Sequence, residues 1–210
     1  MAADPIRAFR NAIDLLRAGD PAAAQALPEL ERFPQYGPGW LELGALLQDR
    51  GQYEAAIIAL GRAARSSPIA AHRLGQCLAA NGKRDAAIAN FQAALHLDAN
   101  FAQAHYSLGL AYQDTGDHTA AIHAYREALR LQTDFHEAAF NLGVSLQETG
   151  DFDTALAAYG QAFRLRPQSL ARIAQALTSA RHGALWLDPA ALRRTLSGAH
   201  ENSSGSDPVR

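Results

Sequence analysis

The sequence is poor in several residue types, and each shortage excludes a class of protein. Cys77 is the only cysteine, so no internal disulfide can form, and we expect a reducing compartment. We also expect Cys77 to be a small buried residue rather than a reactive thiol. Lys83 is the only lysine, and the formal net charge is −2. Non-specific binding of nucleic acid needs a clustered positive field, so this charge balance argues against a nucleic-acid partner.

Long uncharged apolar runs are also missing. Charged residues interrupt the first twenty positions, so this stretch does not read as a secretory signal, and no later run is long enough to span a bilayer. We therefore expect a cytoplasmic protein with no membrane insertion. The alanine-rich composition is typical of a bacterial, high-GC coding sequence.

The motifs that carry catalysis or bind metals are absent from the sequence. It contains no glycine-rich phosphate loop after a strand, no H-E-x-x-H, no paired-cysteine zinc spacing and no nucleophile elbow. The eight histidines are scattered, and none forms a helical i, i+4 pair with a carboxylate partner. The sequence therefore predicts a protein that is not an enzyme and that uses no cofactor and no metal.

What the sequence does contain is an internal repeat. Residues 102–134 and 136–167 are near copies in which Leu108-Gly109 aligns with Leu142-Gly143, a step of 34 residues (143 − 109 = 34). An earlier copy places Leu74-Gly75 the same distance upstream (109 − 75 = 34). Self-similarity at such a period indicates stacked structural repeats.

The first copy is spaced differently from the others. Its Leu43-Gly44 pair lies only 31 residues before the next one (75 − 44 = 31), so about three residues are missing at the Ser66-Ser67-Pro68 junction. We expect the helix that follows this junction to begin nearly a turn late.

Each copy predicts a pair of helices joined by a tight turn. Apolar residues recur every three or four positions, which places them on one face of a helix. Small residues such as Gly109 and Ala121 are expected where two helix backbones approach closely. Asp117 and Asp151 stand where a second helix would take a capping oxygen. Left-handed turn residues are expected at Gly51, Gly82, Gly116 and Gly150. One hairpin cannot bury its apolar face alone, so the pairs should stack into an all-α solenoid.

The recurring positions Trp40, Leu43-Gly44, Leu47, Ala56, Leu60 and Pro68 resemble the tetratricopeptide repeat. The resemblance implies a right-handed superhelical solenoid of stacked antiparallel helix pairs. Four repeats are expected, at 37–68, 69–101, 102–135 and 136–167. The triplet Asn141-Leu142-Gly143 is most similar to repeats of O-linked N-acetylglucosamine transferases, and we expect a likeness of repeat subtype, without a catalytic domain.

The two ends of the chain are expected to depart from the repeat. Residues 5–36 read as a degenerate helical hairpin whose second helix is kinked or ended by Pro28. Residues 168–197 should form a capping helix and a short C-terminal helix, and 198–210 a disordered tail. Between those helices, Leu185-Trp186-Leu187 either packs onto the cap or forms a docking patch.

In tetratricopeptide solenoids the first helix of each pair lines a concave groove that receives a peptide. The resemblance therefore implies a set of groove residues, one group from each repeat: Gln48, Asp49; His72, Arg73, Gln76; Gln103, Tyr106, Ser107, Leu110, Gln113, Asp114; and Glu137, Phe140, Asn141, Val144, Gln147, Glu148.

The predicted function is protein–protein interaction, as a scaffold, an adaptor or a chaperone-like assembly factor that grips a peptide segment of a partner. Four groove carboxylates would favour a basic partner, and Tyr106 and Phe140 would supply apolar contact. Two alternatives stay open. One is an accessory subunit of a separately encoded enzyme, and the other is a structural protein that self-associates as a homo-oligomer.

Overall fold

The computed structural model describes residues 4–20, 26–179 and 189–197. All regular structure in these ranges is helical, which confirms the predicted all-α fold of stacked helix pairs. The chain divides into two compact units, Met1–Thr115 and Gly116–Arg210. Leu185-Trp186-Leu187 and the expected tail at 198–210 lie outside the described residues.

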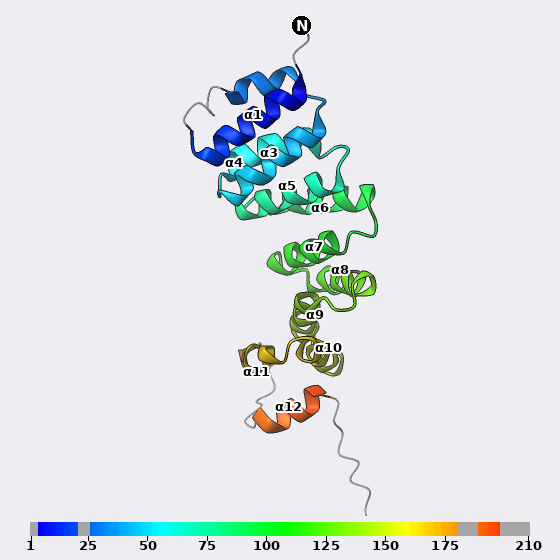
Figure 1. Ribbon diagram of the computed structural model, residues 1–210. Helices are drawn as coiled ribbons and strands as arrows, with labels where there is room; N and C mark the ends of the chain where they lie inside the picture. Colours follow the sequence, from blue (N-terminus) through cyan, green and yellow to red (C-terminus); the bar gives the residue numbers. More distant parts are fainter. Residues whose placement is uncertain (1–3, 21–25, 180–188, 198–210) are drawn as a thin grey trace, which may run out of the picture. The chain divides into compact units, whose positions relative to one another are not determined.

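The first unit begins with α1 and continues through three neighbouring layers of helices (Figure 1). Helix α3 packs on α1 and α4, α5 packs on α4 and α6, and α7 packs on α6. The expected second helix of the N-terminal hairpin is represented by a short 3₁₀ helix, η1, with Pro28 in its first turn. The elements are α1 (Pro5–Ala18), η1 (Leu27–Arg32), α3 (Gly37–Asp49), α4 (Tyr53–Ala63), α5 (Pro68–Ala80), α6 (Arg84–Leu97) and α7 (Ala102–Asp114).

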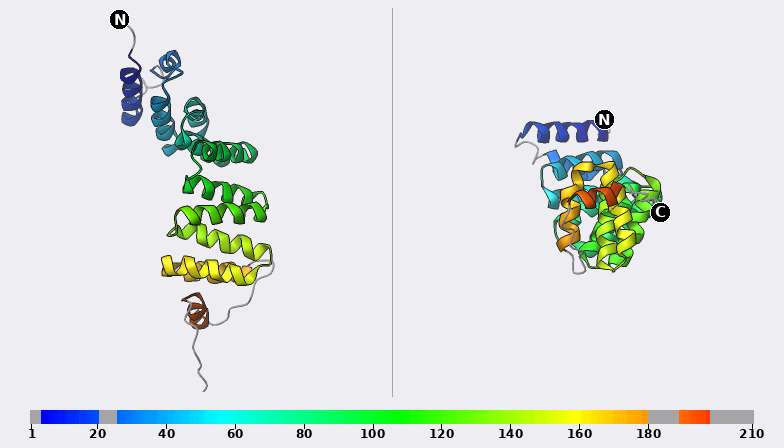
Figure 2. Two further views of the ribbon diagram at one scale, coloured as in Figure 1. Left: turned by 90° about the vertical axis from the view of Figure 1, so that its right-hand side faces the viewer. Right: turned by 90° about the horizontal axis from the view of Figure 1, so that it is seen from below.

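The second unit begins with three helices packed in chain order, α8 on α9 and α9 on α10 (Figure 2). Two further helices cover this stack, because α11 packs on α9 and α12 packs on α10. Their buried residues are Ile173, Leu177, Leu192 and Leu196. The elements are α8 (His118–Leu131), α9 (His136–Glu148), α10 (Phe152–Leu165), η2 (Pro167–Ser169), α11 (Leu170–Ser179) and α12 (Pro189–Ser197).

The turn and cap predictions are confirmed. Positive φ angles occur at all four expected turn glycines, for example 70° at Gly51 and 74° at Gly82. A side chain with a Cβ rarely adopts this conformation, so glycine suits each turn. The Asp117 and Asp151 carboxylates accept hydrogen bonds from the Ala120 and Thr154 backbone N–H groups, at 3.0 and 3.3 Å.

The prediction of a late helix start after the Ser66–Pro68 junction is wrong. Helix α5 begins seven residues before Gly75, just as α7 begins seven residues before Gly109 (75 − 68 = 109 − 102 = 7). The missing residues instead shorten the preceding helix, because α4 has 11 residues whereas α6, α8 and α10 have 14. The close contact between Gly75 and the partner helix fixes α5 in place, so the deletion is absorbed in the last turn of α4.

Candidate functional site

In the first unit, a row of hydrogen bonds joins predicted groove residues across neighbouring first helices. The Arg73 guanidinium on α5 donates to Gln48 Oε1 on α3 at 2.9 Å. The Gln48 amide in turn donates to Gln76 Oε1 at 3.2 Å. We call the side that carries these three side chains the first-helix wall. Because each amide or guanidinium is held by a neighbour, the wall offers polar groups in fixed positions.

His72 and Ser107 were predicted to face the groove, but both are buried within the first unit. Their side chains are 2.8 Å apart and link α5 to α7. The His72 ring also contacts Phe91 and Phe101, with ring centroids 5.7 and 5.0 Å away. Burial, with the Arg73 charge as the second cause, lowers the pKa of His72 to about 4. The ring is therefore neutral at neutral pH, and its contacts give it a structural role.

The other predicted groove residues of the first unit remain accessible. Asp49, Gln103 and Asp114 are exposed, whereas the remaining three are half-buried: Tyr106, Leu110 and Gln113. Two of the predicted carboxylates, Asp49 and Asp114, are thus available to a partner. Each is the last residue of its helix and follows a glutamine that was predicted to face the groove, Gln48 or Gln113.

In the second unit, helix α11 covers part of the predicted groove. The Arg172 guanidinium lies 4.0 Å from the centre of the Phe140 ring, and only 5% of Phe140 is exposed. Gln147 is 1% exposed, and its amide donates to the Ala176 carbonyl oxygen at 3.3 Å. Asn141 is buried as well. Phe140 and Gln147 are therefore withdrawn from the candidate surface because α11 lies against them, and Asn141 is withdrawn because it is buried.

Glu137, another predicted groove residue, is already paired. Its carboxylate is 3.2 Å from the Arg166 guanidinium and 3.6 Å from His136 Nδ1. Burial acts to raise the pKa of Glu137, but a backbone hydrogen bond and the Arg166 charge outweigh it, so the pKa is lowered overall. The pair leaves less charge for a basic partner than the sequence suggests. Val144 and Glu148 are half-buried.

Tyr159→Phe is expected to destabilise the second unit by about 1–3 kcal/mol, because a buried acceptor would lose its donor. The Tyr159 hydroxyl donates to Gln147 Oε1 at 2.9 Å, and both side chains are buried. Tyr112→Phe is the matched control, because its hydroxyl accepts from an exposed partner, Gln92. Urea unfolding followed by circular dichroism measures both changes. Equal losses in the two variants would contradict the assignment of a buried hydrogen bond.

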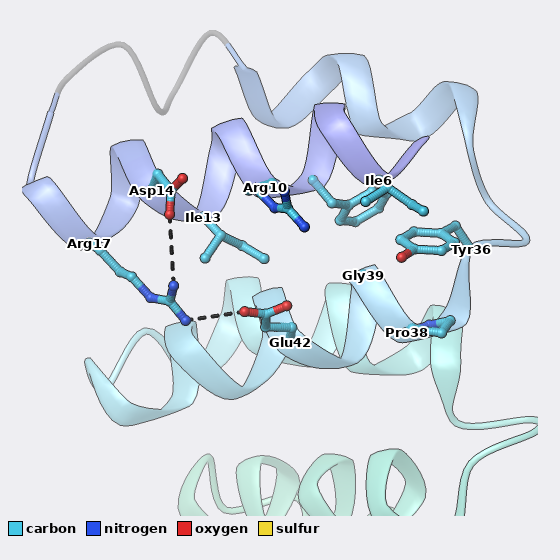
Figure 3. Close-up of a pocket in the computed structure, with 10 residues that line it drawn as sticks. Ile6, Arg10, Ile13, Asp14, Arg17, Tyr36, Pro38, Gly39 and Glu42 are labelled. Carbon is cyan, nitrogen blue, oxygen red and sulfur yellow. Dashed lines mark hydrogen bonds and ion pairs between the residues drawn. The ribbon is translucent and has the colours of Figure 1, made fainter. Parts of the chain in front are cut away.

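A cavity of about 380 Å³ lies between α1 and α3, beyond the predicted groove residues (Figure 3). This volume is within the ~300–1,000 Å³ range of ligand pockets. Gly39 forms part of the lining, and a Cβ there would lie 2.5 Å from Phe9 Cγ, so the glycine allows α1 to approach α3. The cavity is lined by Ile6, Phe9, Arg10, Ile13, Asp14, Arg17, Tyr36, Pro38, Gly39 and Glu42.

Arg17 bridges both acidic residues of the cavity. Its guanidinium is 3.7 Å from Asp14 Oδ1 and 3.1 Å from Glu42 Oε1 (Figure 3). The sequence analysis did not predict this cavity, because its first predicted groove residue is Gln48 in the first full repeat. The helical spacing of Ile6, Phe9 and Ile13 could have indicated that this face of α1 packs against a neighbouring helix.

The described part of the chain shows neither a metal cluster nor a membrane helix. Within residues 4–20, 26–179 and 189–197, no group of three or more His, Cys, Asp or Glu side chains could hold a metal ion. None of the helices in these ranges combines the length and apolar character that a membrane crossing requires.

Comparison with known families identifies the repeat. A family profile described as tetratricopeptide repeat matches residues 106–169 and 140–204, and a second, described as TPR repeat, matches 75–116. No curated protein matches the sequence significantly. The matches do not test the likeness to glycosyltransferase repeats, which stays a prediction.

Solved structures of similar fold cover most of the chain. A crystal structure of MamA protein has 25% identity and a TM-score of 0.69, covering 80% of this chain and 94% of that chain. Another MamA crystal structure has 27% identity and a TM-score of 0.67, covering 76% and 96%. YrrB, described as a TPR protein with an unusual peptide-binding site, has 19% identity and a TM-score of 0.65, covering 78% and 87%, and shows likeness of fold alone. The chain therefore carries tetratricopeptide repeats, matched by the family profiles within residues 75–204, and its described helices have the fold of tetratricopeptide-repeat proteins.

Proposed function

We propose that this chain is a protein-binding module that holds a peptide segment of a partner against the first-helix wall of its first unit. The observation that carries the proposal is the row formed by Gln48, Arg73 and Gln76. These three side chains come from helices α3 and α5, and each is hydrogen-bonded to another side chain of the row. A surface that is already ordered loses little side-chain entropy when a ligand binds.

The wall has the chemistry that an extended peptide requires. Amide and guanidinium groups can bond to a peptide backbone, and the exposed carboxylates Asp49 and Asp114 can pair with basic side chains. Half-buried Tyr106 and Leu110 add apolar area. YrrB, a protein of the same fold, is described as having a peptide-binding site, which supports peptide binding as something this fold can do.

The second unit contributes less to the proposed surface. Its first helix, α9, already meets α11 through Phe140 and Gln147. We therefore place the partner on the first unit and treat α11 as part of the fold. A bacterial, cytoplasmic setting belongs to the same proposal. The bacterial source is inferred from the alanine-rich composition, and the cytoplasmic location from the single cysteine and the interrupted apolar runs.

Site-specific photocrosslinking tests this function. A photoreactive benzoylphenylalanine at Gln103, which is exposed on α7, should capture a partner in a lysate of the source organism. The same residue at Glu54, exposed on the second helix α4, is the matched control and should capture several-fold less. Mass spectrometry of the crosslinked product then identifies the partner segment.

The wall variant Arg73→Ala with Gln76→Ala tests whether this capture depends on the hydrogen-bonded row. Capture from Gln103 should fall because the fixed polar row is lost, whereas the second-helix variant Glu54→Ala should leave it unchanged. Equal yields of crosslinked partner from the two positions would refute the binding surface. An unchanged yield from Gln103 in the Arg73→Ala with Gln76→Ala variant would refute it as well. A stoichiometric enzyme among the captured proteins would support the accessory-subunit alternative.

A further inference from the structure

The first-helix wall has an apolar end, where the helices α3 and α5 begin. Ile69 precedes Gln76 by seven residues on α5, so it lies on the same helix face as the hydrogen-bonded row, and it is 50% exposed. Pro38, the exposed second residue of α3, holds the corresponding position on that helix. A Cβ on Gly37 would lie 3.9 Å from Ser66 Oγ, so the start of α3 is close to the segment that leads into α5. An aliphatic side chain of a ligand would bury apolar area at this end.

The opposite end of the wall is acidic. Helices α3, α5 and α7 contain three acidic residues and one basic residue, a net charge of −2 with histidine neutral (1 − 3 = −2). One of the acids, Glu42, is paired with Arg17. The other two, Asp49 and Asp114, are exposed and make no ion pair in the part of the chain that the structure describes. A cation is therefore missing at the ends of α3 and α7.

The backbone adds to the negative potential at this acidic end. The C-terminus of a helix carries a partial negative charge, which a nearby cation stabilises and an aspartate opposes. The second helices α4, α6, α8 and α10 each have a basic residue in the last turn, whereas α3, α5 and α7 have none. Arg50, which follows Asp49, donates instead to the Leu16 carbonyl oxygen at 2.7 Å. Lys83 stands at the start of α6, and among the described residues it pairs with neither carboxylate.

We propose that the first-helix wall binds a peptide that lies along the first helices, with an aliphatic side chain on Ile69 and a lysine or arginine at Asp49 or Asp114. Ile69 and Ala80, the last residue of α5, are eleven residues apart (80 − 69 = 11), which is about 16 Å along a helix. An extended peptide covers this distance in about five residues. The inference rests on the proposed function and adds the orientation of the ligand and the spacing of its two anchoring side chains.

Selection from a random twelve-residue peptide library displayed on phage, with the full chain as bait, tests this ligand. Binders should be enriched in Lys or Arg placed about four to six residues from Leu, Ile or Val. A fluorescein-labelled binder should lose about threefold or more in affinity for the wall double variant Asp49→Asn with Asp114→Asn, because an exposed ion pair is lost. Raising the salt concentration should weaken its binding to the unmodified chain more than its binding to this variant.

The matched control removes the same charge from second helices. Glu54→Gln with Asp85→Asn replaces two exposed acids in the first turns of α4 and α6, and it should change the affinity by less than about twofold. Acids are favourable at a helix N-terminus and unfavourable at a C-terminus, so the control should melt at a lower temperature and the wall double variant should not. Weaker binding without lower stability would show that the two wall aspartates serve a ligand rather than the fold.

The apolar anchor is tested with a second pair of variants. Ile69→Ser should lower the affinity of the same binder by about threefold or more, because apolar contact area is lost. Ile58→Ser is its control, since Ile58 is 62% exposed on the second helix α4, and it should change the affinity by less than about twofold.

Several outcomes would overturn the proposed ligand while leaving the binding function intact. These are binders without basic residues, equal affinity losses in the wall and control double variants, equal effects of Ile69→Ser and Ile58→Ser, or a lower melting temperature for the wall double variant. A library that yields no binder would overturn the ligand as well. Failed crosslinking from Gln103 would overturn the proposed function itself.

Discussion

Gly75→Leu is expected to lower the free energy of unfolding by about 3 kcal/mol, because the helix crossing has no room for a side chain. A Cβ at this position would lie 2.5 Å from Phe91 Cε1 and 2.7 Å from Phe91 Cδ1. Both residues are buried where α5 and α6 cross. Either the ring or the whole of α5 must shift, and urea unfolding followed by circular dichroism measures the cost.

Gly61→Leu is the matched control for this overpacking. A Cβ at Gly61 meets nothing within 4 Å, and the residue is exposed within α4. Leucine has the better helix propensity, so this variant should gain about 0.5–1 kcal/mol. In the double variant Gly75→Leu with Phe91→Ala, part of the lost stability should return, because removing the ring opens the space. Additive losses would show that the two side chains do not compete for one site.

The stability of the first unit is expected to fall by up to about 3 kcal/mol between about pH 7 and about pH 4, because His72 is held neutral in the fold. Burial, and secondarily Arg73, lower its pKa to about 4, whereas an unfolded histidine has a pKa of about 6.5. The unfolded chain therefore takes up this proton first as the pH falls. The loss begins near the unfolded pKa and is complete below the folded one.

His72→Gln separates this effect from other titrations. Glutamine can still bond to Ser107 but carries no charge, so the variant should lose less stability on acidification. His136 remains in both proteins, and its pKa is lowered by burial and by Arg166, so some pH dependence should persist. Urea unfolding at several pH values gives the comparison. Identical pH profiles for the two proteins would contradict the assignment to His72.

The sequence predicted the features of this fold that are local. A glycine at each turn and a Leu-Gly pair in each first helix follow from backbone geometry and from one helix crossing, so a single repeat is enough to read them. The length of α4 was harder to predict. A deletion between two helices can shorten either the helix that precedes the deletion or the helix that follows it. Only the packing of Gly75 on Phe91 decides between them.

The candidate site was predicted in part, because periodicity identifies a helix face but not what covers it. Gln48, Arg73 and Gln76 lie together in the structure because their positions follow from the repeat register, and their role in a binding groove stays a prediction. The burial of Gln147 depends on α11, a helix outside the four repeats, which the repeat pattern does not position. The α1–α3 cavity depends on a degenerate hairpin that matches the repeat poorly.

The turns between paired helices have a practical consequence. At Gly51, Gly82, Gly116 and Gly150, the place where a Cβ would sit has no neighbour within 4 Å. No side-chain packing constrains these turns, so residues inserted beside them would meet no steric conflict. A short affinity tag or a foreign epitope spliced in beside any of them should be displayed outward without disturbing the buried helix crossings, which makes the molecule a convenient carrier.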